Sequence, residues 1–252
     1  SDLETLAICR DSLAEGARTA LPVGIACALV GVIVGVMTLT GAANTFGQFI
    51  VGVGQNSLFL SLILTMITCI ILGMGIPTIP NYIITSSIAA PALLELGVPL
   101  IVSHMFVFYF GILADLTPPV ALACFAAAPI AKESGLKISF EAVKVAAAGF
   151  VVPFMAVYTP ALMLQDGGPL AQAVGYVPAV IYIVFKTLIA LSLWGATVIG
   201  WLGRPLALWE RGLGMLAAFT LVAALPLTDE IGFALSAVFL ALLWYRRKQA
   251  PA

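Results

Sequence analysis

Charged side chains are scarce in this chain, and a long stretch has none. Only 9% of the 252 residues are Asp, Glu, Lys or Arg, whereas a soluble domain carries roughly 25%. From Thr19 to Leu94, 76 consecutive residues contain no formal charge, which no core element of a soluble protein would match. Together with 62% hydrophobic residues, this predicts an all-α polytopic membrane protein.

Histidine and paired cysteines are also scarce. His104 is the only histidine, and the four cysteines lie apart without a CxxC pair: Cys9, Cys27, Cys69 and Cys124. We therefore expect no transition-metal site, and we interpret the cysteines as small apolar packing residues. An intramembrane protease using Asp115 or His104 would need a partner residue, but the sequence has no second membrane aspartate, no GxSG and no HExxH. We expect neither enzymatic activity nor an organic cofactor.

An excess of basic residues and a recognisable signal peptide are not seen in this sequence. The net charge of −1 implies no surface for nucleic acid. No cleavable signal peptide is visible, because the chain opens with an amphipathic, charged stretch. Since it begins at Ser1 rather than Met, we expect a fragment of a longer polypeptide.

Apolar runs and their polar borders predict the order of the helices. They are an interfacial amphipathic helix at 1–19, a span at 20–40, a polar loop at 41–57, a hairpin at 58–97, a broken span at 100–131, a span at 145–164, a turn at 165–176, and C-terminal transmembrane helices at 177–203, 209–225 and 230–245.

The segment 58–97 is interrupted halfway by the sequence GMGIPTIP, which begins at Gly73. Its arms, 58–72 and 81–95, would each be roughly 22 Å long at 1.5 Å per residue, whereas the hydrocarbon core is about 30 Å thick. We therefore predict a re-entrant hairpin that enters and leaves on one side of the membrane. Two short full spans are the competing interpretation.

The segment 100–131 is interrupted by Asp115-Leu116-Thr117-Pro118-Pro119. As one helix it would be roughly 48 Å long, too long for a simple span. We predict a single crossing that is unwound near the membrane middle, where it meets the tip of the hairpin. Paired interrupted segments are the best sequence indication of a transporter's binding site.

Basic residues test this topology. The predicted crossings place ten of the eleven basic residues on one side of the membrane, in segments 1–18, 132–144, 204–211 and 246–248. By the positive-inside rule that side, including the C-terminus, is cytoplasmic. The agreement requires the hairpin to return to its own side, because a single crossing would put 132–144 opposite 1–18.

The hairpin tip offers oxygen ligands without formal charge. Gly73 and Gly75 permit close backbone approach and positive φ, and Pro77 fixes the turn. Thr78 adds a hydroxyl group and Asn81 a carboxamide. Small alkali cations prefer such oxygen ligands, including backbone carbonyls. The N-terminus of the following helix could also attract a carboxylate.

The second break offers Asp115, Thr117 and the carbonyls freed by Pro118 and Pro119. A carboxylate in a membrane is costly and usually paired or functional. Three roles for Asp115 remain open: capping a half-helix that begins at Thr117 with proline in the first turn, contributing to a cation site, or carrying a proton.

His104 and Lys186 are the other polar residues inside spans. His104 could relay protons, but a packed, hydrogen-bonded histidine is the simpler interpretation. Lys186 either pairs with an acid across the bundle or extends its charge to the interface.

Several motifs resemble one family of transporters. They are GMGIPT at 73–78, APALLELGV at 90–98, HMFVFYFG at 104–111, DLTPPVAL at 115–122 and VPF at 152–154. Their order and spacing resemble the large membrane subunit of tripartite ATP-independent periplasmic (TRAP) transporters, most closely the fused, TAXI-type permeases. The resemblance is strongest at 70–165, and 205–252 is more weakly similar to the extra C-terminal helices of the fused form.

This resemblance implies a sodium-coupled, elevator-type importer of organic acids in a bacterial or archaeal inner membrane, supplied by a periplasmic solute-binding protein. The family has two inverted repeats, and residues 20–165 resemble the second, so the N-terminal half of the permease would be a partner. By analogy, sodium would bind around Gly73, Gly75 and Thr78, together with Asp115, Thr117 and Pro118. Pro77, Asn81 and Pro119 would lie on the substrate side.

Two alternatives remain. One is another ion-transporter-type carboxylate or ion symporter that works without a binding protein. The other is a membrane subunit with only a structural role, which would leave the two breaks without a purpose.

Overall fold

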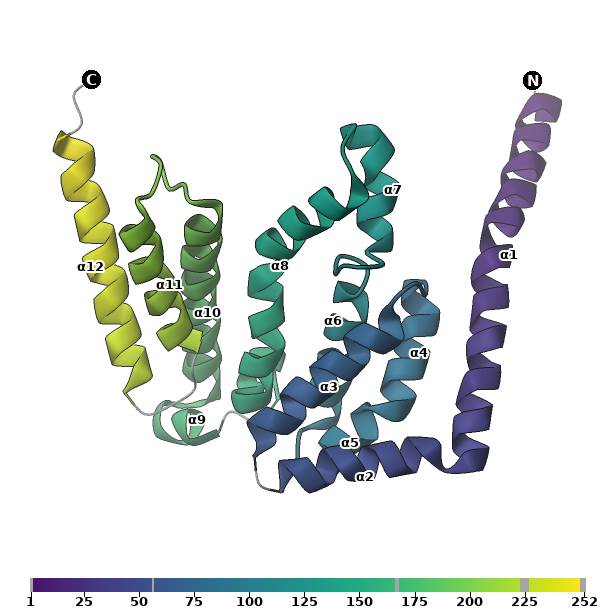
Figure 1. The fold of residues 1–252 in the computed structure, drawn as a ribbon, viewed down its shortest axis with the longest axis horizontal. Coiled ribbons are helices and arrows are strands. Elements are labelled where there is room, and N and C mark those ends of the chain that lie inside the picture. The colour runs from purple at the N-terminus through teal and green to yellow at the C-terminus, as the bar shows by residue number, and fades with distance from the viewer. Residues whose placement is uncertain (1, 56, 166–167, 223–226, 250–252) are drawn as a thin grey trace.

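The structure is a computed structural model that describes residues 2–55, 57–165, 168–222 and 227–249. Within these ranges the regular structure is helical and no strand forms, as composition predicted (Figure 1). Three helical segments are long and apolar enough to cross a membrane: Gly135–Tyr158, Tyr176–Ile199 and Thr228–Arg246. A fourth candidate is the bent pair Cys27–Thr40 and Asn44–Gly54. The protein is therefore a multi-pass membrane protein.

The first two helices differ from the prediction. Helix α1 runs without interruption over Asp2–Thr40, so the predicted interfacial segment 1–19 and the predicted span 20–40 belong to one helix. The first residue in the left-handed region is Gly41, with φ of 70°, and it starts α2, Ala42–Gly54. The two apolar segments of α1 and α2 meet at 72°.

Residues 41–57, predicted as a loop, contain helix α2. Glycine and polar content suggested a loop, but Ile50 is fully buried and its carbonyl accepts a 2.6 Å hydrogen bond from the Ser61 hydroxyl on α3. Packing along the edge of the bundle therefore outweighs weak helix propensity.

The hairpin lies where it was predicted. It consists of α3 (Leu58–Gly73), α4 (Thr78–Ile88) and α5 (Ala90–Glu95). Ser57 caps α3 by accepting from the Leu60 amide. In Figure 1, α3 leaves the edge formed by α2, and α4 returns from the tip to that same edge. The second arm is divided at Ala89, next to Pro91, which lacks an amide hydrogen.

The broken helix also lies where it was predicted. Helix α6 (Leu100–Leu113) and helix α7 (Leu122–Ala131) flank eight non-helical residues. Helix α8 then runs over Gly135–Tyr158, and a 3₁₀ turn, η1, follows at Pro160–Met163. Compared with the predicted span 145–164, helix α8 begins earlier, where Ser134 accepts a hydrogen bond from the Lys137 amide. It also ends earlier, just before Pro160.

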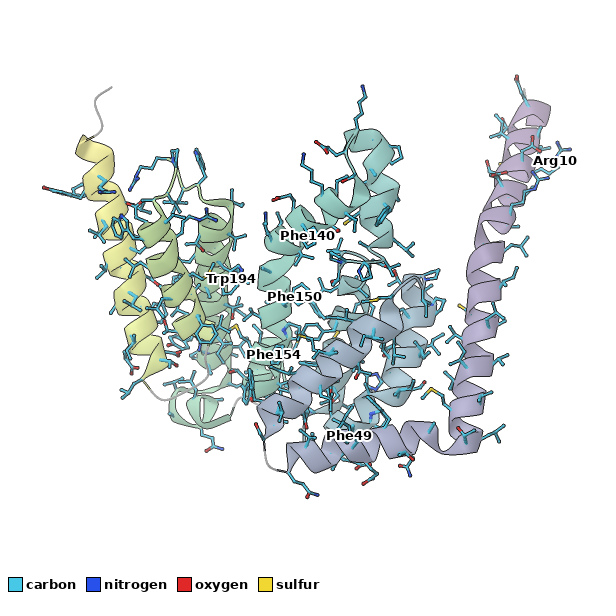
Figure 2. All side chains as sticks on the ribbon, in the orientation of Figure 1. Arg10, Phe49, Phe140, Phe150, Phe154 and Trp194 are labelled. Carbon is cyan, nitrogen blue, oxygen red and sulfur yellow. The ribbon has the colours of Figure 1, made fainter. Side chains whose placement is uncertain are left out.

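Aromatic rings fill the core between the hairpin and helices α6 and α8. Phe106 and Phe110 of α6 are buried, and their ring centroids lie 5.3 and 5.7 Å from that of Phe154 on α8. Figure 2 shows Phe150 and Phe154 on the side of α8 that faces α6. The hairpin, α6 and α8 therefore form one packed body.

The C-terminal helices form a second core. After the short helix α9 (Gly168–Val174), which lies in the predicted turn, come α10 (Tyr176–Ile199), α11 (Leu208–Val222) and α12 (Thr228–Gln249). Their buried contacts include Ala190, Leu193, Ala217, Ala218, Leu221 and Phe239. Helix α10 ends before the predicted residue 203 because Gly200 turns the chain with φ of 79°.

Both termini lie at one edge of the molecule, together with the α7–α8 and α10–α11 connections (Figure 1). Helices α2, α5 and α9 lie at the opposite edge. Arg10 lies near the N-terminal end of α1, at the edge of the termini (Figure 2). The helix directions thus bring together the segments in which the sequence concentrates basic residues.

Candidate functional site

The tip of the hairpin exposes backbone between α3 and α4. Gly75 has φ of 78°, which favours glycine, and Pro77 precedes the first turn of α4. Within the described residues, the carbonyls of Met74, Gly75 and Ile76 accept no hydrogen bond from the backbone or from a side chain. The tip therefore keeps three adjacent oxygen acceptors available.

Asn81 joins the tip to the broken helix. Its side chain is 1% exposed, and its Nδ2 donates a 2.6 Å hydrogen bond to the Gly111 carbonyl on α6. The amide oxygen, Oδ1, is buried and has no hydrogen-bond partner among the described residues. An unpaired buried acceptor costs about 1–3 kcal/mol, so it calls for an explanation.

Glycine at positions 73 and 111 makes this contact possible. A Cβ atom at Gly73 would lie 2.7 Å from both the Asn81 Nδ2 and the Gly111 carbonyl oxygen, and 2.9 Å from the Cβ of Ala114. A Cβ atom at Gly111 would lie 2.8 Å from the Asn81 Oδ1. The end of α3 therefore meets the end of α6 in close backbone contact, next to the second break.

The second break forms a series of turns from Ala114 to Val120, with a cis peptide bond between Pro118 and Pro119. The two prolines deprive the carbonyls of Ala114 and Asp115 of their usual donors four residues on. Both carbonyls find others: Ala114 accepts from the Thr117 amide, and Asp115 accepts from the Ala123 amide at 3.2 Å. These freed carbonyls are therefore already hydrogen-bonded.

Asp115 does not cap a helix. Helix α7 begins at Leu122, after Ala121 with φ of 40°, and has no side-chain cap, so the expected half-helix starting at Thr117 was wrong. The Oδ1 of Asp115 is buried without a hydrogen-bond partner in the described part of the chain. Of the three open roles for Asp115, capping is excluded, and its carboxylate remains available to a cation or a proton.

The other predicted residues of the second break lie at its surface or just below it. Thr117 is half-buried, and its hydroxyl donates a 2.7 Å hydrogen bond to the Leu113 carbonyl. Since the hydroxyl is the donor, its oxygen can still accept or bind a cation. Pro118 is half-buried and Pro119 is exposed.

The two breaks approach each other a second time through Gly75. A Cβ atom there would lie 3.6 Å from the Val120 side chain. Gly75, Pro77 and Thr78 are exposed, whereas Asn81 is buried. The amide of Asn81, which we assigned to the substrate side, is thus enclosed between α4 and α6.

His104 has a protein partner. Its Nδ1 lies 2.8 Å from the Tyr82 hydroxyl, and the two rings pack edge to face. Tyr82 is on α4 and His104 on α6, so this pair forms another link between the hairpin and the broken helix. The interpretation of His104 as a packed, hydrogen-bonded residue is confirmed.

Lys186 pairs across the C-terminal bundle. Its Nζ lies 2.9 and 3.1 Å from the carboxylate oxygens of Asp229 on α12, and the Tyr182 hydroxyl donates to the same carboxylate at 2.8 Å. The predicted pairing of Lys186 with an acid is confirmed, and the site at the hairpin tip does not include it.

Sequence reasoning did not assign a role to Gly111 or Tyr82. Gly111 is one of the chain's 23 glycines, and Tyr82 follows Asn81 without a recognisable motif. The sequence did contain one indication of a role for Gly111. It lies four residues before Asp115, and therefore about one helical turn before the break.

Comparison with known families gives one match. Residues 3–170 match the family described as "Tripartite ATP-independent periplasmic transporter, DctM component". The match covers the hairpin and the broken helix. The chain matches no curated protein and no solved structure.

Proposed function

Because the chain belongs to the DctM component family of tripartite ATP-independent periplasmic transporters, we propose that it forms part of a sodium-coupled permease for organic acids. The observation that supports sodium coupling is that two buried oxygens, Asn81 Oδ1 on α4 and Asp115 Oδ1 in the second break, have no hydrogen-bond partner among the described residues. Sodium, a hard cation, prefers such oxygen ligands.

The residues fit a cation better than a neutral ligand. Free carbonyls at Met74, Gly75 and Ile76 supply partial negative charge from one side of the contact. Asp115, in the second break, would supply a full negative charge, and Thr117, two residues further along, would add a hydroxyl oxygen. Bound sodium would neutralise the carboxylate, which is otherwise costly at membrane depth. Thr78 and Pro118 are further candidate ligands at the rim.

We propose that the substrate carboxylate binds near the start of α4. The amides of Thr78 and Ile79 have no intrahelical acceptor there, and Pro80 has no amide hydrogen. A helix N-terminus and an adjacent cation both favour a carboxylate. The exposed residues Pro77 and Pro119 would border this position. Asn81, which is buried in the first turn of α4, would lie behind it.

The two separate cores support an elevator-type movement. The hairpin, α6 and α8 share one core, whereas α10, α11 and α12 share another. We expect the first body, which contains both breaks, to move as a unit. The return of α4 to the starting edge of α3 supports a re-entrant hairpin within this body (Figure 1).

We further propose that this chain supplies the second inverted repeat of a fused, TAXI-type permease, with an N-terminal half as its partner. The described residues contain one hairpin and one broken helix, which correspond to one repeat. The extra helices α10–α12 fit the fused form. Basic segments gathered at one edge favour an inner-membrane protein with that edge in the cytoplasm.

Uptake by the intact permease tests this function. The full-length protein, reconstituted in liposomes with its periplasmic solute-binding protein, should import radiolabelled organic acids only with an inward sodium gradient. Uptake without the binding protein would favour a symporter of the wider ion-transporter group. No uptake of any acid in a panel of dicarboxylates, 2-oxo acids and sugar acids would favour a structural subunit.

Thr117→Val should weaken sodium dependence. Valine keeps the shape of threonine but removes the hydroxyl oxygen, so we expect the sodium concentration for half-maximal uptake to rise about tenfold, equivalent to about 1.4 kcal/mol. Thr117→Ser keeps the oxygen and should behave like the unmodified protein.

Gly75→Val should also weaken sodium dependence, because valine is strained at positive φ. If both valine variants kept the original sodium dependence, the site assignment would fail.

A further inference from the structure

A group of arginines lies at the ends of the C-terminal helices, far in sequence from the hairpin. It consists of Arg204, Arg211 and Arg246, and we call it the arginine cluster. Arg204 and Arg246 both contact one carboxylate, that of Glu210, which is 1% exposed. Arg211 is committed elsewhere, since its guanidinium donates to the carbonyls of Thr197 and Val198 at the end of α10.

Glu210 cannot satisfy the cluster alone. Its Oε2 accepts from the Ala207 amide at 2.8 Å, and its Oε1 is shared by Arg204 and Arg246. The Nε of Arg204 remains buried without a hydrogen-bond partner in the described ranges. Two guanidinium groups, those of Arg204 and Arg246, thus share one carboxylate, and the Nε of Arg204 is unused among the described residues. Such a site has spare capacity for an anion.

The unused donor belongs to a residue that lines a pocket. The pocket has a volume of about 180 Å³ and is bordered by Leu202, Arg204, Leu240, Leu243 and Trp244. Apart from Arg204, these side chains are apolar or aromatic. The lining therefore combines a cationic residue, which suits an anion, with apolar walls, which suit hydrocarbon.

Exposed tryptophans mark the level of this pocket in the membrane. Trp201, Trp209 and Trp244 are all at least half exposed, and the Arg246 guanidinium lies 5.2 Å from the centre of the Trp209 ring. Tryptophan is enriched where hydrocarbon meets headgroups. The exposed tryptophans therefore favour a position of the arginine cluster near the phospholipid phosphates.

We propose that this pocket binds an anionic phospholipid. Its phosphate would accept hydrogen bonds from Arg204 and Arg246, since guanidinium groups bind phosphate oxygens with strong, charge-assisted bonds. One acyl chain would lie over Leu240, Leu243 and Trp244. Free inorganic phosphate would use the arginines but leave the apolar wall uncovered, so the geometry favours a lipid. This proposal requires only that the helices lie in a bilayer and is independent of the transported substrate.

Lipid binding can be measured on the purified full chain by native mass spectrometry. Phosphatidylglycerol and phosphatidylcholine with the same acyl chains would be titrated separately, and inorganic phosphate would be added as a competitor. We expect phosphatidylglycerol to bind at least about tenfold more tightly than phosphatidylcholine, a difference of about 1.4 kcal/mol. Phosphate at the same concentration should not displace it. Equal binding of the two lipids, or displacement by phosphate, would overturn the proposal.

Variants distinguish lipid binding at this pocket from attraction to positive charge elsewhere on the protein. Arg204→Gln/Glu210→Gln keeps the net charge and replaces a buried ion pair by two neutral amides, so it should fold and yet lose the preference for phosphatidylglycerol. Arg18→Gln removes one charge from an exposed arginine on α1 and should keep that preference. Leu240 is a half-exposed residue of the pocket wall. Leu240→Trp should narrow the pocket and so weaken the binding of both lipids. Unchanged preference in the double variant would also overturn the proposal.

Discussion

Gly73→Ala is expected to abolish sodium-driven uptake while the protein still inserts in the membrane. The added Cβ atom would lie 2.7 Å from the Gly111 carbonyl oxygen, and real Cβ atoms essentially never approach another atom so closely. Because that oxygen belongs to the backbone of α6, the hairpin tip itself must withdraw. A displacement of about 1 Å at a site of this kind can cost on the order of 100-fold in rate.

Two other glycine-to-alanine variants serve as comparisons for Gly73→Ala. At Gly111 the nearest atoms to an added Cβ belong to the Asn81 side chain rather than to the backbone, so Gly111→Ala should shift the Asn81 carboxamide and weaken sodium dependence without forcing the hairpin tip to withdraw. At Gly35 on α1 no atom lies within 4 Å, so Gly35→Ala should transport normally. Uptake would be normalised to the amount of monodisperse protein. Normal sodium-dependent uptake by Gly73→Ala would show that the two breaks need not touch.

Lys186→Met is expected to destabilise the C-terminal bundle by about 3 kcal/mol. Lys186 and Asp229 form a pair whose side chains are 6% and 29% exposed, and removing one partner of a buried ion pair costs about 3–5 kcal/mol. The partial exposure of Asp229 puts the expected value at the lower end, because water can solvate the remaining carboxylate. The Tyr182 hydroxyl would still donate to that carboxylate.

The double variant Lys186→Met/Asp229→Leu should recover most of this loss, because no buried charge is left unpaired. Lys137→Met, in the exposed pair of Lys137 with Glu133, is the control and should cost less than about 1 kcal/mol. Thermal unfolding of the detergent-purified variants, followed by circular dichroism, would rank them. A double variant as unstable as the single one would mean that Lys186 contributes by packing rather than by charge.

The positions of both breaks were predictable from the sequence. Glycine and proline disrupt helices through the absence of a side chain or of an amide hydrogen, and these effects act locally. The tip therefore lies at 74–77 and the second break at 114–121, as expected. Local information also placed α10, α11 and α12 within a few residues of their bounds.

The prediction failed where contacts between distant residues decide the structure. Residues 42–54 form α2 because Ile50 is buried against α3, which no local pattern revealed. Asp115 does not cap a helix because the chain makes turns through Pro119 and starts α7 only at Leu122. The enclosure of Asn81 likewise depends on a distant contact, because its amide reaches Gly111, which is 30 residues away.

By itself the sequence determined that this protein lies in a membrane, that two of its segments are broken there, and that basic residues favour one side. These properties follow from composition and from the local chemistry of glycine, proline and charge. Only the tertiary structure decided that the two breaks touch through Gly73, Asn81 and Gly111, and that Lys186 pairs with Asp229. Such contacts join residues far apart in the chain, and they depend on how whole helices pack rather than on any short segment.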